Sequence, residues 1–231
     1  MSESSCNNCD SQLPAGAHFC PACGQSIKES SRPWLEFIRD TLTELLDFDG
    51  RMLVSMRMLL TRPGFLSYEY INGRRLSYTS PVRMYLVISL VFFFVLPLIL
   101  PDTSASNPEH RISVDLYSKA MFLMLPLFAL LLKLFYRHSY YLAHLVFTVH
   151  LFSAMFIVFA ITLSIETLAD RYLVVLLIQL VLLIYMVAYS IIALHTTYQQ
   201  TRSKSALKLL GLLLLFLPVL GVAIEWASHS E

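Results

Sequence analysis

The sequence predicts an all-α integral membrane helical bundle of about five transmembrane helices, preceded by a small N-terminal zinc ribbon. Three observations support this prediction. Of the 231 residues, 56% are hydrophobic and only 14% are charged, whereas soluble domains carry about 25% charged residues. Long apolar runs follow residue 82, and the hydrocarbon core of a bilayer needs about 20 such residues per helix. All four cysteines precede Gly24, in two CxxC pairs.

The first segment, 1–27, is predicted to be the zinc ribbon. Two CxxC turns separated by a ten-residue spacer can direct four thiolates at one ion and complete a closed tetrahedral shell. The expected ligands are Cys6, Cys9, Cys20 and Cys23. No secretory signal precedes them, so we expect a reducing, cytosolic location that favours metal binding over disulfides. We expect Pro14-Ala15-Gly16 to turn a short hairpin between the pairs.

The predicted Zn²⁺ is structural, because a closed four-cysteine shell leaves no open position for a substrate. An iron centre with the same four ligands remains an alternative. Residues 1–27 contain no Arg or Lys, so no nucleic acid is expected as a partner. A contact with a cytosolic protein, or a purely structural role, is favoured.

The second segment, 28–81, is predicted to hold a polar linker, amphipathic helices and a basic, tyrosine-rich entry to the membrane. The helix over 34–48 has an acidic polar face, which is unsuited to anionic lipid. We therefore expect this helix, and the next over 51–61, to pack on the bundle or a partner. Pro63 suits the first turn of a further short helix, Asn72-Gly73 its end, and Ser80-Pro81 the start of the first span.

Arginines interleave with tyrosines in this entry, and two interpretations stay open. Guanidinium groups can pair with lipid phosphate; alternatively, arginines fix orientation and tyrosines form the interfacial belt. The candidate headgroup ligands are Arg62, Arg74, Arg75 and Arg83.

The same stretch resembles an uncharacterised bacterial membrane family that is catalogued as a domain of unknown function. The resemblance rests on the four cysteines and on a pattern of the form RPG…YxxGxR…Y…P…Y. The matching residues are Arg62-Pro63-Gly64, Tyr70, Gly73, Arg74, Tyr78, Pro81 and Tyr85. It implies a bacterial cytoplasmic-membrane protein and brings no activity with it.

The third segment, 82–231, is predicted to cross the membrane five times. The spans are placed at about 82–100, 117–136, 140–165, 172–195 and 206–226. The second is uncertain because Lys119 and Lys133 interrupt it, but omitting it would move Arg202, Lys204 and Lys208 outside. Five spans with a cytosolic N-terminus keep most Lys and Arg inside and place the C-terminus outside.

Histidines within the spans suggest a possible polar intramembrane cluster. Its candidate members are His144, His150 and His195. A proton-coupled or metal-binding role is one interpretation, and hydrogen bonding between helices is the other. His144 and His150 are six residues apart, which places them on different helix faces.

The sequence contains none of the common hydrolase, metalloprotease, phosphate-loop or EF-hand motifs, so it gives no indication of an enzyme. The first functional hypothesis is a non-enzymatic multi-pass scaffold or membrane-organising protein that recruits a cytosolic partner through the ribbon. The alternative is a small transporter or lipid-handling protein that uses the arginine-lined entry and proline-kinked spans. Membrane lipids are expected partners in both cases.

Overall fold

The computed structural model describes residues 5–27, 50–99, 124–166 and 173–229. In these ranges all the regular structure is helical, apart from two isolated β-bridges near the N-terminus. The predicted linker, the amphipathic helix 34–48 and the loop that follows the first span lie outside the described residues. The helices are α2 (Gly50–Thr61), α3 (Phe65–Ile71), α4 (Pro81–Ile99), an unlabelled helix Met124–Phe135, α7 (Tyr141–Glu166), α8 (Leu173–Tyr198) and α9 (Arg202–His229).

Three of these helices are long and apolar enough to cross a membrane. They are Tyr141–Ile165, Leu173–Tyr198 and Arg202–Val222, with mean hydropathies of 2.2, 2.6 and 2.2. The first two predicted spans fall on apolar helices that are shorter within the described residues, Pro81–Leu96 and Met124–Phe135; residues 100–123, between them, lie outside the described ranges. The all-helical membrane-type bundle is therefore confirmed, with full-length spans at the last three predicted positions.

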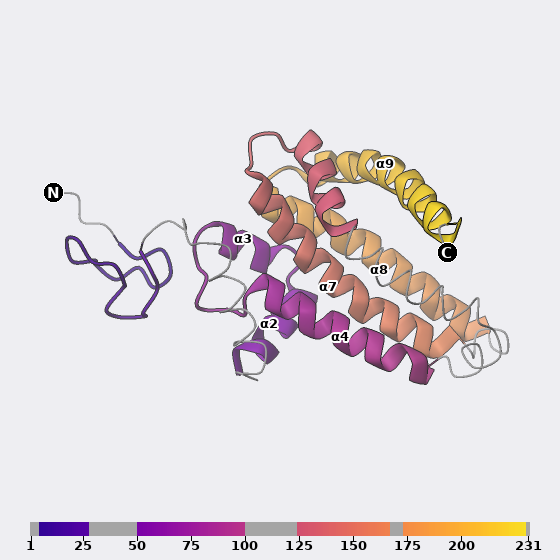
Figure 1. Cartoon of the computed structure of the whole chain (residues 1–231), viewed down its shortest axis with the longest axis horizontal. Coiled ribbons are helices and arrows are strands. Elements are labelled where there is room, and N and C mark those ends of the chain that lie inside the picture. The colour runs from indigo at the N-terminus through magenta and orange to yellow at the C-terminus, as the bar shows by residue number, and fades with distance from the viewer. Residues whose placement is uncertain (1–4, 28–49, 100–123, 167–172, 230–231) are drawn as a thin grey trace.

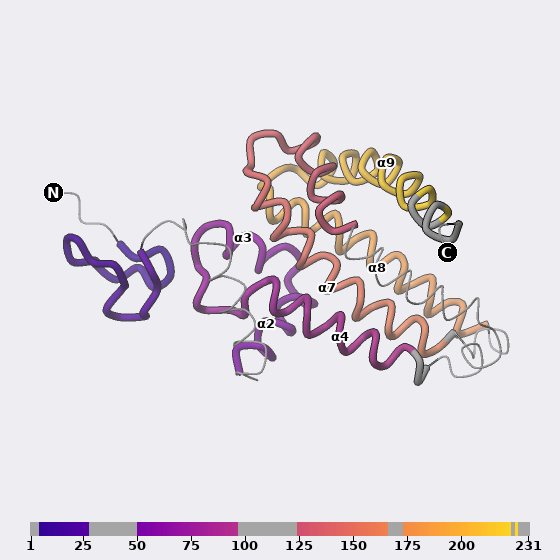
Figure 2. The backbone as a smooth tube through the Cα atoms, viewed as in Figure 1, coloured from indigo at the N-terminus to yellow at the C-terminus, as the bar shows by residue number. Residues whose placement is uncertain are grey.

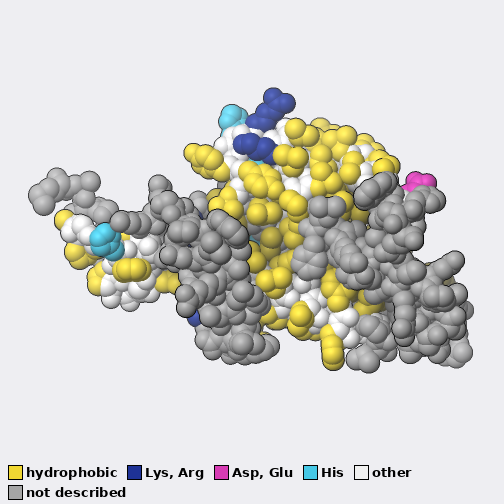
Figure 3. All heavy atoms as spheres, in the orientation of Figure 1, with side chains coloured by type: hydrophobic (Ala, Val, Ile, Leu, Met, Phe, Trp, Pro, Cys, Tyr) yellow, Lys and Arg dark blue, Asp and Glu magenta, His cyan; other side chains and the backbone are white. Residues whose placement is uncertain are grey.

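Helix α7 is the centre of the bundle. It packs against α4 on one side and α8 on the other, while α9 packs against α8 (Figure 1). Over the most apolar stretch of each helix, the buried share is 61% in α7, 17% in α8 and 22% in α9. Exposed Leu, Val and Ile side chains on α8 and α9 give this side of the bundle a hydrophobic surface (Figure 3). Soluble proteins rarely leave so large an apolar surface open, whereas lipid tails would cover it.

The chain passes back and forth so that several turns meet at one end of the bundle (Figure 2). The N-terminal ribbon, the turn 136–140 and the turn 199–201 lie toward one end, which we call the ribbon end, and the C-terminus lies at the other. Every described Lys and Arg belongs to α2, the loops on either side of α3, the start of α4, or the chain around these two turns. The described basic residues thus gather toward the ribbon end.

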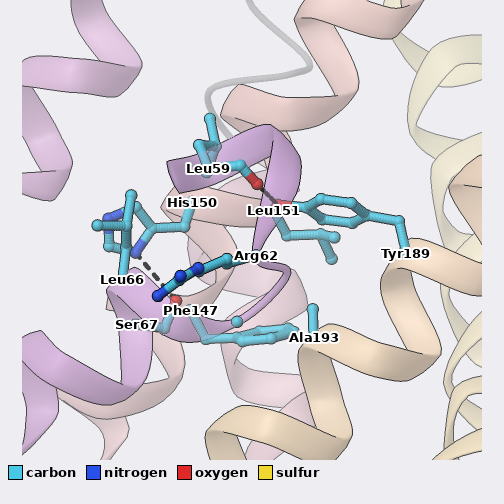
Figure 4. A pocket seen from close by; sticks show the side chains of 10 residues that line it. Leu59, Arg62, Leu66, Ser67, Phe147, His150, Leu151, Tyr189 and Ala193 are labelled. Atoms are coloured by element: carbon cyan, nitrogen blue, oxygen red, sulfur yellow. Dashed lines mark hydrogen bonds between the residues drawn. The ribbon is translucent and has the colours of Figure 1, made fainter. Parts of the chain in front are cut away.

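Helices α2 and α3 pack against α7 and α8 rather than standing free. The hydroxyl of Tyr189 donates to the carbonyl of Leu59 (2.8 Å), and that of Tyr185 to Leu60 (3.0 Å). These α8 tyrosines satisfy carbonyls at the end of α2 that have no partner within their own helix. Figure 4 shows Tyr189 reaching toward Leu59 beside a narrow gap, which Arg62 also enters.

The start of α3 differs from the prediction at Pro63. The helix begins at Phe65, with Gly64 as its N-cap in the left-handed region (φ 78°), so Pro63 lies in the turn rather than the first helical turn. The reason is packing, because the chain reverses against α8, where only a glycine fits. The predicted end at Asn72-Gly73 and the predicted start at Pro81 agree with the structure.

Candidate metal centre

The two CxxC pairs form the same tight turn twice. The N–H of Asp10 donates to the carbonyl of Cys6, and the N–H of Gly24 donates to that of Cys20, each at 2.8 Å. Asp10 and Gly24 both take positive φ, 58° and 75°. Asp tolerates this left-handed conformation better than most residues, which explains why the first turn does not need glycine.

These turns bring four sulfur atoms together. Sγ of Cys6 lies 3.7 Å from that of Cys23, and Sγ of Cys9 lies 3.6 Å from that of Cys20. All four lie within 4.8 Å of one another, and none is in a disulfide. Zn–S bonds of about 2.3 Å place tetrahedral sulfurs about 3.8 Å apart. The four cysteines therefore fit a metal ion, as the CxxC spacing predicts.

The serine between the pairs favours thiolates. Ser11 Oγ lies 3.0 Å from Cys9 Sγ and 3.2 Å from Cys20 Sγ. The interaction with the Ser11 side chain lowers the pKa of Cys20 to about 6, although burial acts in the opposite direction. The Ser11 side chain also lowers the pKa of Cys9. At Cys23 the N–H of Gln25 favours the thiolate, but burial and the neighbouring sulfurs raise the pKa to about 11. A bound cation would stabilise the thiolate of Cys23, because a thiol that coordinates a metal ion is deprotonated.

The predicted hairpin is only partly right. A turn does form at Pro14–Ala17, where the N–H of Ala17 donates to the carbonyl of Pro14 (3.1 Å). The β-bridges, however, join Ser5 to Gln12 and Phe19 to Ser26. Each bridge closes one knuckle over its own cysteines, so each knuckle is ordered locally rather than by pairing of the chain across the turn.

The ribbon docks on the loop that joins α3 to α4. We call residues 72–77 the docking loop. Gln25 contacts it twice: its Nε2 donates to the carbonyl of Gly73 (2.7 Å), and its Oε1 accepts from the N–H of Arg75 (3.3 Å). From the other knuckle, Asn8 Oδ1 accepts from Ser77 Oγ (3.1 Å). Both halves of the candidate metal centre thus contact the docking loop.

A chain of charges reinforces this contact. Arg74 lies 3.1 Å from Glu69 of α3 and 3.9 Å from Asp10 of the first knuckle. Only 9% of the Glu69 side chain is exposed, whereas 44% of that of Arg74 is exposed. The hydrogen bond that Arg74 donates to Glu69, and the negative charge of that carboxylate, raise the pKa of Arg74. The guanidinium therefore links a nearly buried carboxylate of the bundle to the ribbon.

Arg74→Gln is expected to destabilise this end of the molecule, because it leaves the Glu69 carboxylate buried without its cation. We expect the thermal unfolding midpoint in detergent to fall by about 3 °C or more. Arg75→Gln is the matched control: its guanidinium lies over the Tyr70 ring at 5.3 Å, and its backbone N–H keeps the bond to Gln25. Equal shifts for both variants would contradict the role given to Arg74.

The four arginines predicted to bind headgroups have separate surroundings. Arg74 is paired as described, Arg75 lies over Tyr70, and Arg62 lies over the Phe65 ring at 5.7 Å. Arg83 is buried at the start of α4, with 5% exposed. Arg62, Arg74 and Arg75 thus each contact a residue of α3, and headgroup binding by the four arginines stays a prediction.

The three span histidines also have separate partners. His144 Nδ1 lies 2.7 Å from the Tyr198 hydroxyl, and His150 Nδ1 lies 3.0 Å from Ser67 Oγ. His195 Nδ1 donates to the carbonyl of Gln200. The first two contacts join α7 to α8 and α7 to α3 (Figure 4 for His150). Each histidine thus makes a hydrogen bond of its own, two of them between helices.

Three residues of the ribbon contact were not predicted from the sequence: Asn8, Gln25 and Ser77. Their side chains are uncharged and follow no ligand spacing, so no pattern marks them. The one nearby signal was Gly73, whose φ of 92° favours glycine; an added Cβ there would lie 3.1 Å from the Asn7 side chain.

Fold and site together define a membrane-type helical bundle with a four-cysteine head that can hold a metal ion. A family model described as a protein of unknown function (DUF3667) matches residues 49–93. The match covers α2, α3, the docking loop and most of the first apolar stretch, and it confirms the resemblance to an uncharacterised family. The ribbon lies outside the matched residues. No curated protein and no solved structure matches the chain.

Proposed function

We propose that this protein is a non-enzymatic membrane scaffold of the bacterial cytoplasmic membrane, and that its zinc-folded ribbon recruits a cytosolic protein. The N-terminus is cytosolic and the C-terminus lies outside. The concentration of described basic residues toward the ribbon end supports this orientation, because Lys and Arg are retained on the cytoplasmic side.

The observation that carries the proposal is the way the ribbon is held. The ribbon is bound to the docking loop through Asn8, Asp10 and Gln25, while the Phe19 side chain remains 59% exposed. Pro21 and Ala22, on the second knuckle, are exposed as well. A rigidly held aromatic side chain in an apolar setting is typical of a protein contact.

The chemistry of the ribbon supports a protein partner over other ligands. Its described residues include no Lys or Arg, so it lacks the positive charge that binding to nucleic acid or anionic lipid requires. A four-sulfur shell around zinc leaves no site for a substrate. The metal ion then acts by fixing the shape of the contact surface.

A photo-reactive amino acid at position 19, in the full chain expressed in its own membrane, tests this function. We expect irradiation of intact cells to give a discrete protein adduct, because Phe19 is exposed. The adduct should disappear when Cys20→Ser is added, since the ribbon then loses its metal-dependent shape.

The same amino acid at Ser77 is the matched control, because that side chain contacts Asn8 within the chain. It should cross-link to the ribbon and give no heavier adduct. An adduct at position 19 that survives Cys20→Ser, or one composed of lipid alone, would contradict recruitment through a folded ribbon.

A further inference from the structure

An open basin of about 890 Å³ lies at the ribbon end, on the bundle itself. Three parts of the chain enclose it: Tyr68, Ile71 and Asn72 at the end of α3, the turn 136–139 before α7, and the turn 199–200 between α8 and α9. Lys208 of α9 contributes to the wall. None of the residues that line the basin is acidic, whereas three, Arg137, His138 and Lys208, can carry positive charge.

Stacked aromatic rings form a firm wall. The rings of Tyr136 and Tyr198 lie 3.9 Å apart at an interplanar angle of 21°. Lys208 Nζ lies 3.8 Å from the centre of the Tyr136 ring and donates to the carbonyl of Phe135 (2.8 Å). An ammonium group has three donors, so this lysine has donors left for a ligand.

Polar atoms at this wall lack partners among the described residues. Tyr136 is only 5% exposed, and its hydroxyl lies near that of Ser205 without a hydrogen bond of normal geometry. The side-chain oxygen of Gln200, another lining residue, is also buried without a partner, as is Ser205 Oγ nearby in the chain. Buried polar groups are nearly always paired; the two hydroxyls could donate to an anion, whereas the amide oxygen can only accept and does not itself favour one.

The rim supplies a guanidinium that is available for binding. Arg137 and His138 are exposed, and neither side chain has a hydrogen bond or ion pair among the described residues. Lys133 Nζ donates to the carbonyls of Arg137 (2.8 Å) and Ser139 (2.5 Å), which fixes the turn that carries them. Figure 3 shows basic side chains gathered at this end of the bundle.

We propose that this basin binds a phosphate group. Arg137 pairs with two of its oxygens, which is the geometry that a guanidinium favours. Lys208 supplies a second cation, and the Tyr136 hydroxyl supplies a neutral donor. The phosphate belongs either to a lipid headgroup or to a soluble phosphate compound. The site is distinct from the arginines of the docking loop.

The test uses the metal-loaded full chain in detergent, with binding measured by native mass spectrometry. The probes are a short-chain phosphatidylglycerol, inorganic phosphate, and a phosphate-free glycolipid of the same chain length. We expect saturable binding of one or both phosphate probes and little binding of the glycolipid. Saturation by phosphatidylglycerol alone assigns a lipid headgroup, and saturation by inorganic phosphate assigns a soluble compound; both support the proposal.

Arg137→Gln should weaken binding about tenfold or more, because it removes a charge-assisted hydrogen-bonding pair. Arg202→Gln is the matched control, since Arg202 is exposed at the start of α9, carries the same charge and does not line the basin. We expect it to change binding less than about twofold. Equal losses in the two variants, equal binding of the glycolipid, or no binding of either phosphate probe would overturn the proposal.

Discussion

Gly64→Ala is expected to lower the free energy of unfolding of the bundle by roughly 2–5 kcal/mol. A Cβ atom at Gly64 would lie 2.4 Å from the backbone oxygen of Ala193 and 2.9 Å from its Cα. Rotation of a side chain cannot relieve this contact, because both atoms belong to the backbone of α8. The left-handed φ of 78° adds strain for alanine. Denaturation in detergent, followed by circular dichroism, measures the loss.

Two further variants separate the causes. Gly221→Ala should cost nothing, because no atom lies within 4 Å of the added Cβ and alanine favours a helix. Gly64→Asn tests the contact itself, since Asn tolerates the left-handed region but still carries a Cβ. We expect it to be as unstable as Gly64→Ala. An Asn variant of native stability would contradict the close approach of α3 to α8.

Cys20→Ser is expected to abolish metal binding and unfold the ribbon while the helices stay in the membrane. Cys20 is 2% exposed and contacts both Ser11 and Cys9. Its loss therefore removes a buried sulfur from the set of four possible ligands. Small four-cysteine folds depend on the ion, because their apolar core is too small to hold them. Elemental analysis of the purified full chain should find one zinc per chain in the wild type and almost none in the variant.

His18→Ala is the control for this measurement. His18 is exposed and lies beside the cysteines in sequence, but it is not a member of the cluster of possible ligands, so the variant should keep its metal. One iron per chain in place of zinc would support the iron alternative. A Cys20→Ser chain that retains the ion, or one that alkaline carbonate extracts from the membrane, would contradict the division into head and bundle.

Local chemistry explains what could be predicted. Four cysteines at CxxC spacing can converge through short turns alone. A long run of apolar side chains indicates a membrane-type helix whatever its neighbours are. The helix boundaries at Asn72-Gly73 and Ser80-Pro81 follow from backbone preferences within a few residues. These features depend little on the rest of the fold.

Contacts between distant segments could not be predicted in the same way. Asn8 meets Ser77, and His150 meets Ser67, across 69 and 83 residues. Their side chains suit many partners, so only the packed structure selects one. The error at Pro63 has the same origin, because the position of α8 decides where α3 starts. The basin combines three separate turns, and a single sequence does not indicate that they meet.

Hydrogen exchange with and without the metal ion tests most directly whether a metal-folded ribbon docks on residues 72–77. Chelation should speed exchange in the ribbon and at the N–H of Arg75, which donates to Gln25. The N–H of Thr79 is the internal control, because it donates to Ser55 within the bundle (2.9 Å) and should stay protected. Unchanged exchange in the docking loop when the ribbon unfolds, or loss of protection throughout α7, would contradict this arrangement.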